Sequence, residues 1–303
     1  RKILFASILK VSNHEMKVAQ LAAYVADRTE YTHGEQSLCQ AIIKMAQDYV
    51  GANNVPLLKP NGQFGSRQQN GQDSASPRYI FTQLQPHTRQ LFHPEDDPLL
   101  TYRVEEGTQV EPTHYMPIVP MLLVNGCNGI ATGYRTMLLP CTLASVIENI
   151  RRLLRKHPIV PMVPCVEGYK GTLDDTMSRG TFSMQSPKKV SITELPLGTS
   201  IVQYKTFLHG SEKVSRFEEH HKDEQLHFIV YLTEPSTDIV KDLHLEKRIA
   251  SSWVALDPAG TVKTYSTRED ILQTFFGLRM RFYEQRKTYQ LQAYAHRLEE
   301  LTH

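Results

Sequence analysis

The sequence DSASPRY at residues 73–79 is a run of small, turn-forming residues that ends with an arginine beside a tyrosine. A phenol is a poor nucleophile at neutral pH because its unperturbed pKa is about 10, so a nucleophilic tyrosine needs a nearby cation or a metal-bound phosphate that favours phenolate. Arg78 supplies a permanent planar cation that can hold a phosphate through two parallel hydrogen bonds. Tyr79 and Arg78 are therefore a candidate nucleophile and its charge-stabilising partner for attack on a phosphodiester.

The neighbouring sequence is more specific than the dipeptide alone. With 14 tyrosines in the chain, an Arg-Tyr pair by itself usually means a surface cation beside a half-buried ring. Here the sequence GQFGSR precedes the pair at residues 62–67, and IFT follows it at residues 80–82. Five other distinctive segments are KVAQLA (17–22), YTHGE (31–35), VGANN (50–54), NGCNGIATG (125–133) and ITELP (192–196).

The run from Gly62 to Thr82 resembles the active-site segment of type IIA DNA topoisomerases, in the form carried by eukaryotic and large-virus enzymes. The bacterial subunits carry a related but different sequence before their tyrosine, and with the five other segments the resemblance covers nearly the whole chain. It implies that Tyr79 attacks a backbone phosphorus, forms a 5′-phosphotyrosyl link and releases a 3′-hydroxyl. By resemblance, the chain is part of the cleavage and religation core of an ATP-dependent homodimer that acts on double-stranded DNA.

The resemblance implies an α+β multidomain fold with three parts. A winged-helix domain with the catalytic tyrosine is expected at residues 1–115, an α/β tower domain at residues 116–265, and the start of a long coiled-coil arm at residues 266–303. Length and composition agree, since 303 residues fit two or three domains, and 40% hydrophobic and 22% charged residues are ordinary for a globular protein. The abrupt start at Arg1 predicts a fragment of a longer protein.

Charge is distributed unevenly behind a net charge of +2. Residues 1–93 contain ten Lys or Arg and six Asp or Glu, and residues 59–93 contain four basic residues and one acid. Such a surface is typical of a phosphate-binding face or of an ordinary solvated one. The four cysteines lack zinc-ligand spacing and no apolar run approaches the length of a membrane span, so the composition predicts an intracellular protein with reduced thiols. For this family the expected place is the nucleus of a cell, or a cytoplasmic or nuclear site of viral replication.

Hydrophobic spacing predicts two consecutive helices near the N-terminus, at residues 17–28 and 35–50. A turn containing Gly34 joins them into a helix-turn-helix, and the Gly- and Pro-punctuated segment 55–71 is expected to form the β wing. Because any helical pair gives a similar pattern, the winged-helix assignment depends on the resemblance.

Local patterns predict four further elements. The Pro-interrupted apolar run 117–124 and the β-rich run 227–232 are predicted strands, and residues 145–156 are a predicted amphipathic helix. Residues 268–303 have helical spacing and no proline. Their periodicity is equally consistent with a coiled-coil arm and with an amphipathic helix that packs on its own domain.

Further site residues come from the resemblance. Ile130 follows a glycine-rich turn and matches an isoleucine that is inserted between base pairs, with a buried loop residue as the alternative. His33 matches a position near the cleaved phosphate, where it could also help to move the phenolic proton, although a lone histidine in a helix-turn-helix is often structural. The cations expected to contact DNA phosphates, each with simple solvation as its alternative, are Arg1, Lys2, Lys17 and Arg67. Gln36, in the leading turn of the second predicted helix, is a further candidate DNA contact that is expected to face the cleavage site.

The chain lacks the sequence signals of a metal or nucleotide site. It has no Asp-x-Asp pair, and its glycine-rich segment has neither a P-loop ending nor a G-x-G-x-x-G pattern. The resemblance therefore places the Mg²⁺ ligands in a TOPRIM domain and the ATP site in an ATPase domain, both outside this chain. Two other functions stay open: a non-catalytic winged-helix DNA-binding protein, which would tolerate phenylalanine at position 79, and a meiotic-type relative that cuts DNA without strand passage.

Overall fold

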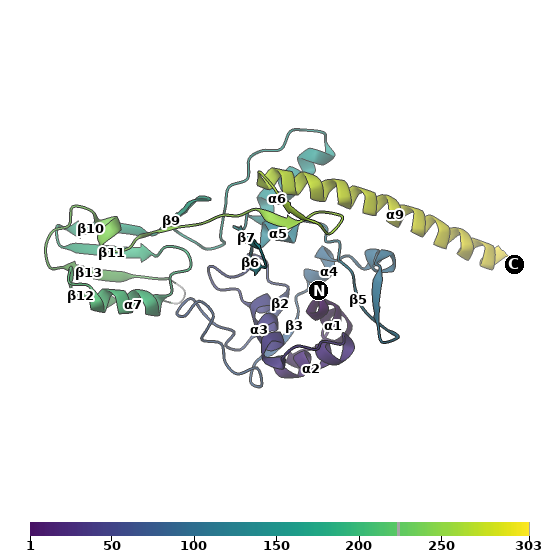
Figure 1. The fold of residues 1–303 in the computed structure, drawn as a ribbon, viewed down its shortest axis with the longest axis horizontal. Helices are drawn as coiled ribbons and strands as arrows, with labels where there is room; N and C mark the ends of the chain where they lie inside the picture. The colour runs from purple at the N-terminus through teal and green to yellow at the C-terminus, as the bar shows by residue number, and fades with distance from the viewer. Residues whose placement is uncertain (223–224, 303) are drawn as a thin grey trace.

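The computed structural model describes residues 1–222 and 225–302, which form an α+β fold drawn out along one axis (Figure 1). A four-stranded sheet lies at one end, the last helix runs to the other end, and three N-terminal helices lie between them. This architecture confirms the predicted fold class.

The N-terminal part packs three helices against a small sheet. The helices are α1 (Lys2–Lys10), α2 (Val18–Arg28) and α3 (Glu35–Ala46). The antiparallel sheet has the order β1 (Met16–Lys17), β3 (Phe81–Leu84), β2 (Leu58–Asn61). The helix predicted at residues 17–28 is confirmed, because α2 buries one face made of Val18, Leu21, Ala22 and Val25.

Two details of the winged helix differ from the prediction. The third helix ends at Ala46 rather than near Val50, because Gln47 leaves the helical conformation with ψ at 133°. The wing is also not contained in residues 55–71, since β2 pairs with β3, which follows Tyr79 in the chain. Residues 62–80 are therefore the loop between the two wing strands, and we call them the wing loop. The candidate nucleophile lies at the end of this loop.

Short elements follow the wing: α4 (Thr88–Leu91), a 3₁₀ helix η1 (Pro94–Leu99), β4 (Tyr102–Glu105), β5 (Thr108–Pro112) and α5 (Met121–Val124). The strand predicted at residues 117–124 is wrong. Pro120 instead precedes one helical turn, and its carbonyl accepts hydrogen bonds from the N–H groups of Leu123 (2.9 Å) and Val124 (3.2 Å). Proline is tolerated where a helix starts, but it cannot donate a hydrogen bond inside a paired strand.

A hairpin and a helix come next, and both contribute buried side chains to the same core as the N-terminal helices. The hairpin joins β6 (Cys127–Ala131) to β7 (Tyr134–Leu138), and α6 (Leu143–Leu154) confirms the amphipathic helix predicted at residues 145–156. One cluster of buried side chains extends from Ile3 to Met162 and also includes Leu272. The N-terminal core therefore continues past residue 115, while the predicted domain boundaries themselves stay predictions.

A second core lies in the four-stranded antiparallel sheet. Its order is β10 (Thr181–Ser186), β11 (Lys189–Glu194), β13 (Phe228–Leu232), β12 (Val214–Glu219), and β13 confirms the strand predicted at residues 227–232. Helix α7 (Ile201–Gly210) belongs to the same core, in which Tyr204 and Leu208 are buried with Phe228 and Val230. We call these four strands and α7 the sheet unit.

The remaining short elements connect the sheet unit to the rest of the chain. A three-stranded sheet has the order β14 (Glu246–Arg248), β9 (Met177–Arg179), β8 (Thr172–Leu173), a hairpin joins β15 (Val254–Leu256) to β16 (Val262–Thr264), and α8 (Ile239–Asp242) is a single turn. Across the described ranges, none of the helices is long and apolar enough to cross a membrane. The thiols of Cys39, Cys127, Cys141 and Cys165 are free.

The long helix predicted at the C-terminus is confirmed as α9 (Arg268–Thr302), which at 1.5 Å per residue is about 50 Å long. Its first half is anchored, because Arg268 pairs with Asp175 and Arg279 pairs with Asp96 at 2.7 Å. The second half projects from the molecule (Figure 1) and exposes a set of apolar and aromatic side chains, namely Tyr289, Leu291, Tyr294, Leu298 and Leu301. Packing on its own domain thus describes only the first half, and the coiled coil stays a prediction.

Candidate active site

Tyr79 presents its side chain to solvent from a fixed backbone. The tyrosine is 72% exposed, whereas the next residue, Ile80, is 2% exposed and belongs to the N-terminal core. Arg78 is also exposed, and its guanidinium carbon lies 5.9 Å from the centre of the Tyr79 ring. The structure thus brings the two predicted catalytic residues together at an open surface that a large substrate can reach.

The start of α2 holds the backbone on both sides of Tyr79. The N–H group of Val18 donates to the carbonyl of Ile80 at 3.0 Å, and that of Ala19 donates to the carbonyl of Pro77 at 3.1 Å. The first N–H groups of a helix have no partner within the helix, so these two are available for such contacts. The Tyr79 N–H closes a turn on the Ser76 carbonyl at 2.9 Å. The candidate nucleophile is therefore held by backbone hydrogen bonds and not by packing of its own ring.

The rest of the wing loop is closed around Gln47, which is not among the residues predicted from the sequence. The Gln47 amide nitrogen donates to the carbonyls of Phe64 (2.8 Å) and Gly71 (3.2 Å). Gly71 has φ at +79°, and a Cβ atom there would lie 2.5 Å from the same amide nitrogen. Asp73 accepts hydrogen bonds from the backbone N–H (2.8 Å) and the hydroxyl of Ser66. A polar residue directly after an apolar helix was the only signal for Gln47 in the sequence.

His33 and Gln36 lie at the entrance of α3. His33 is exposed just before the helix, and its ring contacts the ring of Tyr31 edge to face with 5.3 Å between the centres. Gln36 is exposed in the first turn of α3. Within residues 1–222 and 225–302, no hydrogen bond joins either side chain to Tyr79 or Arg78. Their proposed roles at the cleaved phosphate stay predictions.

The predicted DNA-contacting cations differ in their availability. Lys17 is exposed and lies opposite Phe81 in the β1–β3 ladder, with its ammonium 5.9 Å from the centre of that ring. Arg1 and Lys2 instead reach the buried carboxylate of Glu111, at 3.1 and 3.0 Å. Burial alone would raise the pKa of Glu111, but the hydrogen bonds from Lys2 and Arg1 outweigh it and lower the pKa below its usual value. Of these three cations, Lys17 is exposed on the strand that pairs with the strand after Tyr79, and the other two have a structural partner.

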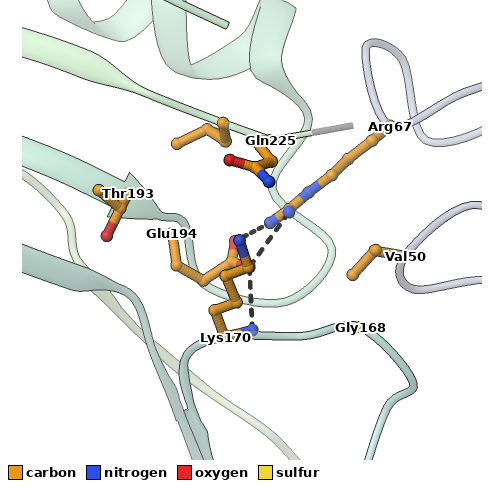
Figure 2. A pocket seen from close by; sticks show the side chains of 8 residues that line it. Val50, Arg67, Gly168, Lys170, Thr193, Glu194 and Gln225 are labelled. Atoms are coloured by element: carbon orange, nitrogen blue, oxygen red, sulfur yellow. Dashed lines mark hydrogen bonds and ion pairs between the residues drawn. The ribbon is translucent and has the colours of Figure 1, made fainter. Parts of the chain in front are cut away.

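Arg67 is also engaged, and the cleft beside it is drawn in Figure 2. The cleft has a volume of about 360 Å³ and is lined by Val50, Arg67, Gly168, Lys170, Thr193, Glu194, Gln225 and Leu226. Both terminal nitrogens of Arg67 donate to the carboxylate of Glu194, one of them at 3.2 Å. Glu194 belongs to the ITELP segment, whose only signal in the sequence is the family resemblance.

Ile130 projects from the β6–β7 hairpin. It is 87% exposed, which contradicts the alternative of a buried loop residue. Its direct cross-strand neighbour is Arg135, which is also exposed. At the base of the hairpin, Gly126 has φ at +68°, and a Cβ atom there would lie 2.4 Å from the Leu138 carbonyl oxygen. The hairpin therefore has a tightly packed base and an apolar tip that is free to contact another molecule.

The adjacent aspartates have structural partners. Asp96 is buried and pairs with Arg279 (2.7 Å) and Arg286 (3.2 Å), while Asp175 pairs with Arg268. Asp174 accepts hydrogen bonds from the N–H and hydroxyl groups of its own turn. Over the part of the chain that the structure describes, no three or more His, Cys, Asp or Glu residues come together as a metal site. The described residues therefore offer no donor set for a resident Mg²⁺ ion.

Comparisons with known proteins identify the class. The family model for the A-type subunits of DNA gyrase and topoisomerase IV matches residues 1–303, so the chain belongs to this family. It is 43% identical over 309 residues to DNA topoisomerase 2 of Arabidopsis thaliana, with 95% of this chain and 21% of that protein covered. It is 38% identical over 320 residues to the mitochondrial DNA topoisomerase 2 of Dictyostelium discoideum, with 100% of this chain and 25% of that protein covered.

A solved structure agrees. The DNA-binding, cleavage and re-ligation domain of Plasmodium falciparum topoisomerase II superposes with a TM-score of 0.91 at 36% identity, and the match covers 95% of this chain and 42% of that chain. The predicted resemblance to eukaryotic type II enzymes is confirmed. The chain spans between a fifth and a quarter of the length of these two curated relatives.

Proposed function

We propose that this chain is part of the DNA cleavage and religation core of an ATP-hydrolysing type II DNA topoisomerase, with Tyr79 as the nucleophile. One observation carries the proposal: a tyrosine that is 72% exposed stands beside an exposed arginine, on a backbone that α2 fixes on both sides. An exposed phenol on a rigid support is suited to a substrate as large as a duplex, because a well-oriented nucleophile lowers the entropic part of the barrier.

In the proposed reaction the Tyr79 oxygen bonds to a backbone phosphorus while the bond from phosphorus to the 3′-oxygen breaks. The phenolic proton passes to a base, and the 3′-oxygen leaves as a hydroxyl after it takes up a proton. His33 is the proposed contact to the cleaved phosphate, where it could also help to move the phenolic proton. Arg78 stabilises the charge that develops on the non-bridging oxygens. Because the phosphotyrosine conserves the energy of the phosphodiester bond, attack by the 3′-hydroxyl reverses the reaction and reseals the strand.

The partners of the proposed function are double-stranded DNA and a second copy of the polypeptide. Two tyrosines in a homodimer would make a staggered double-strand break through which another duplex passes. Mg²⁺ would be held by a TOPRIM domain and ATP by an ATPase domain of the same polypeptide, since this chain has the sequence signals of neither site. Magnesium at such a site supplies charge neutralisation at the phosphate. The proposed place of action of the protein is intracellular, in the nucleus of a cell or at a cytoplasmic or nuclear site of viral replication.

The remaining candidate residues are proposed to contact the DNA backbone or to bend the duplex. Ile130 is the proposed wedge between base pairs, and its exposure on a hairpin tip supports insertion. Lys17, Arg1, Lys2 and Gln36 are proposed DNA contacts. Lys17 has the strongest support among them, because it is exposed and lies next to the strand that follows Tyr79.

The substitution Tyr79→Phe in the complete enzyme tests the function. The variant should form no covalent protein–DNA adduct after denaturant trapping, while its non-covalent DNA affinity stays nearly unchanged, because only the nucleophilic oxygen is removed. Tyr294→Phe, at an exposed tyrosine of α9, is the matched control and should form the adduct normally. Adduct formation by Tyr79→Phe would refute the assignment of Tyr79 as the nucleophile. Absence of the covalent adduct with the wild-type enzyme would favour a non-catalytic DNA-binding protein.

A further inference from the structure

The wing loop is bound to the sheet unit through a buried ion pair. Glu194, at the end of β11, is 1% exposed, and its carboxylate accepts hydrogen bonds from both terminal nitrogens of Arg67 (Figure 2). The same carboxylate accepts the backbone N–H groups of Lys170 (3.1 Å) and Leu195 (2.8 Å). Four donors therefore fix its position, and the Arg67 guanidinium is held in turn.

Backbone contacts reinforce this connection. The first two N–H groups of α7, from Ile201 and Val202, donate to the carbonyls of Arg67 (3.4 Å) and Gln68 (3.1 Å) in the wing loop. The Asn70 side chain donates to the carbonyl of Gly198 at 3.0 Å. The loop thus supplies partners that the start of a helix otherwise lacks. Arg67 and Gln68 are therefore bound to the sheet unit, and Asn70 is bound to the turn that precedes α7.

Separate hydrogen bonds, linked to one another by short stretches of backbone, lead from this contact to the segment before Tyr79. Ser66, next to Arg67, donates to Asp73 from its backbone N–H and its hydroxyl. Ala75 then donates to the carbonyl of Gln63 at 2.8 Å, and the carbonyl of Pro77 accepts from α2 at 3.1 Å. A displacement of Arg67 would therefore be passed to the segment that presents Tyr79.

We propose that Arg67 and Glu194 are positioning residues for the cleavage reaction, which couple the sheet unit to the placement of Tyr79. This inference rests on the proposed function and replaces the expectation that Arg67 contacts a DNA phosphate. Arg67 has only 13% of its side chain exposed, and both of its terminal nitrogens are engaged with Glu194. Its guanidinium acts through the wing loop, and the reacting phosphate is stabilised by other groups.

The test uses the complete enzyme with Arg67→Gln, Glu194→Gln and the double variant. Three quantities are measured: the rate of covalent adduct formation at saturating DNA, the Kd for a duplex at several salt concentrations, and the Tm. Each single variant should slow adduct formation by about 100-fold, since a displacement of about 1 Å at a nucleophile can have this effect. The double variant should be no slower than either single variant, because both remove one interaction. The Kd and its salt dependence should be unchanged.

Two further variants sharpen the experiment. Arg67→Lys keeps the charge but cannot form the two-pronged contact, so its rate should lie between those of the wild type and Arg67→Gln. The control is the double variant Arg216→Gln/Glu218→Gln, which removes an exposed Arg–Glu pair of 2.6 Å on β12 of the same sheet unit. It should keep the wild-type rate.

Three results would overturn the proposal. A phosphate contact at Arg67 would weaken DNA binding in Arg67→Gln and reduce the salt slope by about 1, with no such change in Glu194→Gln. A parallel loss of Tm, DNA affinity and cleavage would mean that the pair only holds the fold. Wild-type adduct rates in all variants would show that the pair does not position Tyr79. The last result leaves the proposed function intact, whereas absence of the adduct with the wild-type enzyme would refute that function itself.

Discussion

The substitution Gln47→Met should release the wing loop without unfolding the rest of the molecule. Gln47 is 7% exposed, and its amide nitrogen donates to two carbonyls of the loop, at 2.8 and 3.2 Å. Methionine has a similar length and keeps the packing, but it has no donor. A buried polar group without its partner costs about 1–3 kcal/mol. Because the carbonyls of Phe64 and Gly71 would both lose their donor, the substitution should destabilise the closed loop by about 2–6 kcal/mol.

Hydrogen exchange of the complete enzyme measures this effect locally. The amides of Gly71, Ala75 and Tyr79 are hydrogen-bonded inside the loop, so they exchange when it opens. A change of about 2 kcal/mol should speed their exchange by roughly 30-fold, since every 1.4 kcal/mol is a factor of ten. Gln40→Met, at an exposed position of α3, is the matched control and should leave the exchange unchanged.

Unchanged exchange across residues 62–80 in Gln47→Met would refute the reasoning, because other contacts would then be sufficient to close the loop. Loss of protection in all of α1–α3 would also contradict it, since the effect would be global. The local result has a consequence for the chemistry. A loop that opens more often should also slow formation of the Tyr79 adduct, with little change in DNA affinity.

Other substitutions test the neighbouring groups. Arg78→Ala should slow cleavage on the order of 100-fold with a much smaller loss of DNA affinity, and Arg78→Lys should recover only part of the cleavage rate. An equal loss of cleavage rate and DNA affinity in Arg78→Ala would make Arg78 a simple phosphate contact. Gly71→Ala should speed hydrogen exchange in the wing loop more than Gly107→Ala speeds exchange in the turn around residue 107. Both glycines have positive φ, but only at Gly71 would the new Cβ atom collide with Gln47. Equal effects of the two substitutions would show that crowding against Gln47 is not the cause. Ile130→Ala should reduce the DNA bend, measured by energy transfer between dyes on the duplex ends, more than it reduces binding, and an unchanged bend would contradict a wedge.

Elements with a strong local pattern were predictable from the sequence. The helices α2, α6 and α9 have apolar residues at helical spacing, and the strand β13 is a continuous run of apolar residues that favour strands. The errors occur where partners distant in sequence decide the conformation. Gln47 ends α3 because its side chain binds carbonyls in the wing loop, and β2 pairs with a strand that comes after the whole of that loop. Apolar content alone also could not show that Pro120 starts a helical turn.

The same limit applies to the candidate site. Arg78 and Tyr79 are adjacent in sequence, so their proximity was certain, and the sequence around them carries the family resemblance from which their chemistry is predicted. Arg67 was a reasonable phosphate contact by charge, but its partner Glu194 lies 127 residues further along the chain. A pairing over that distance depends on how the sheet unit packs against the wing loop. For this reason charge alone predicts a direct role for Arg67, whereas the geometry supports an indirect one.

The side chains of Tyr79 and Ile130 contribute little to folding stability, so a change in function at these positions can be separated from a change in stability. Each is a large side chain in solvent, at 72% and 87% exposure, directly beside positions that the fold holds tightly. Ile80 is buried next to Tyr79, and the base of the Ile130 hairpin is closed at Gly126. Burial of apolar surface stabilises a fold by about 25 cal/mol per Å², so exposed side chains of this size contribute little to folding. Substitutions at these two positions should therefore leave the Tm nearly unchanged, and any loss of cleavage or bending can be assigned to contacts with DNA.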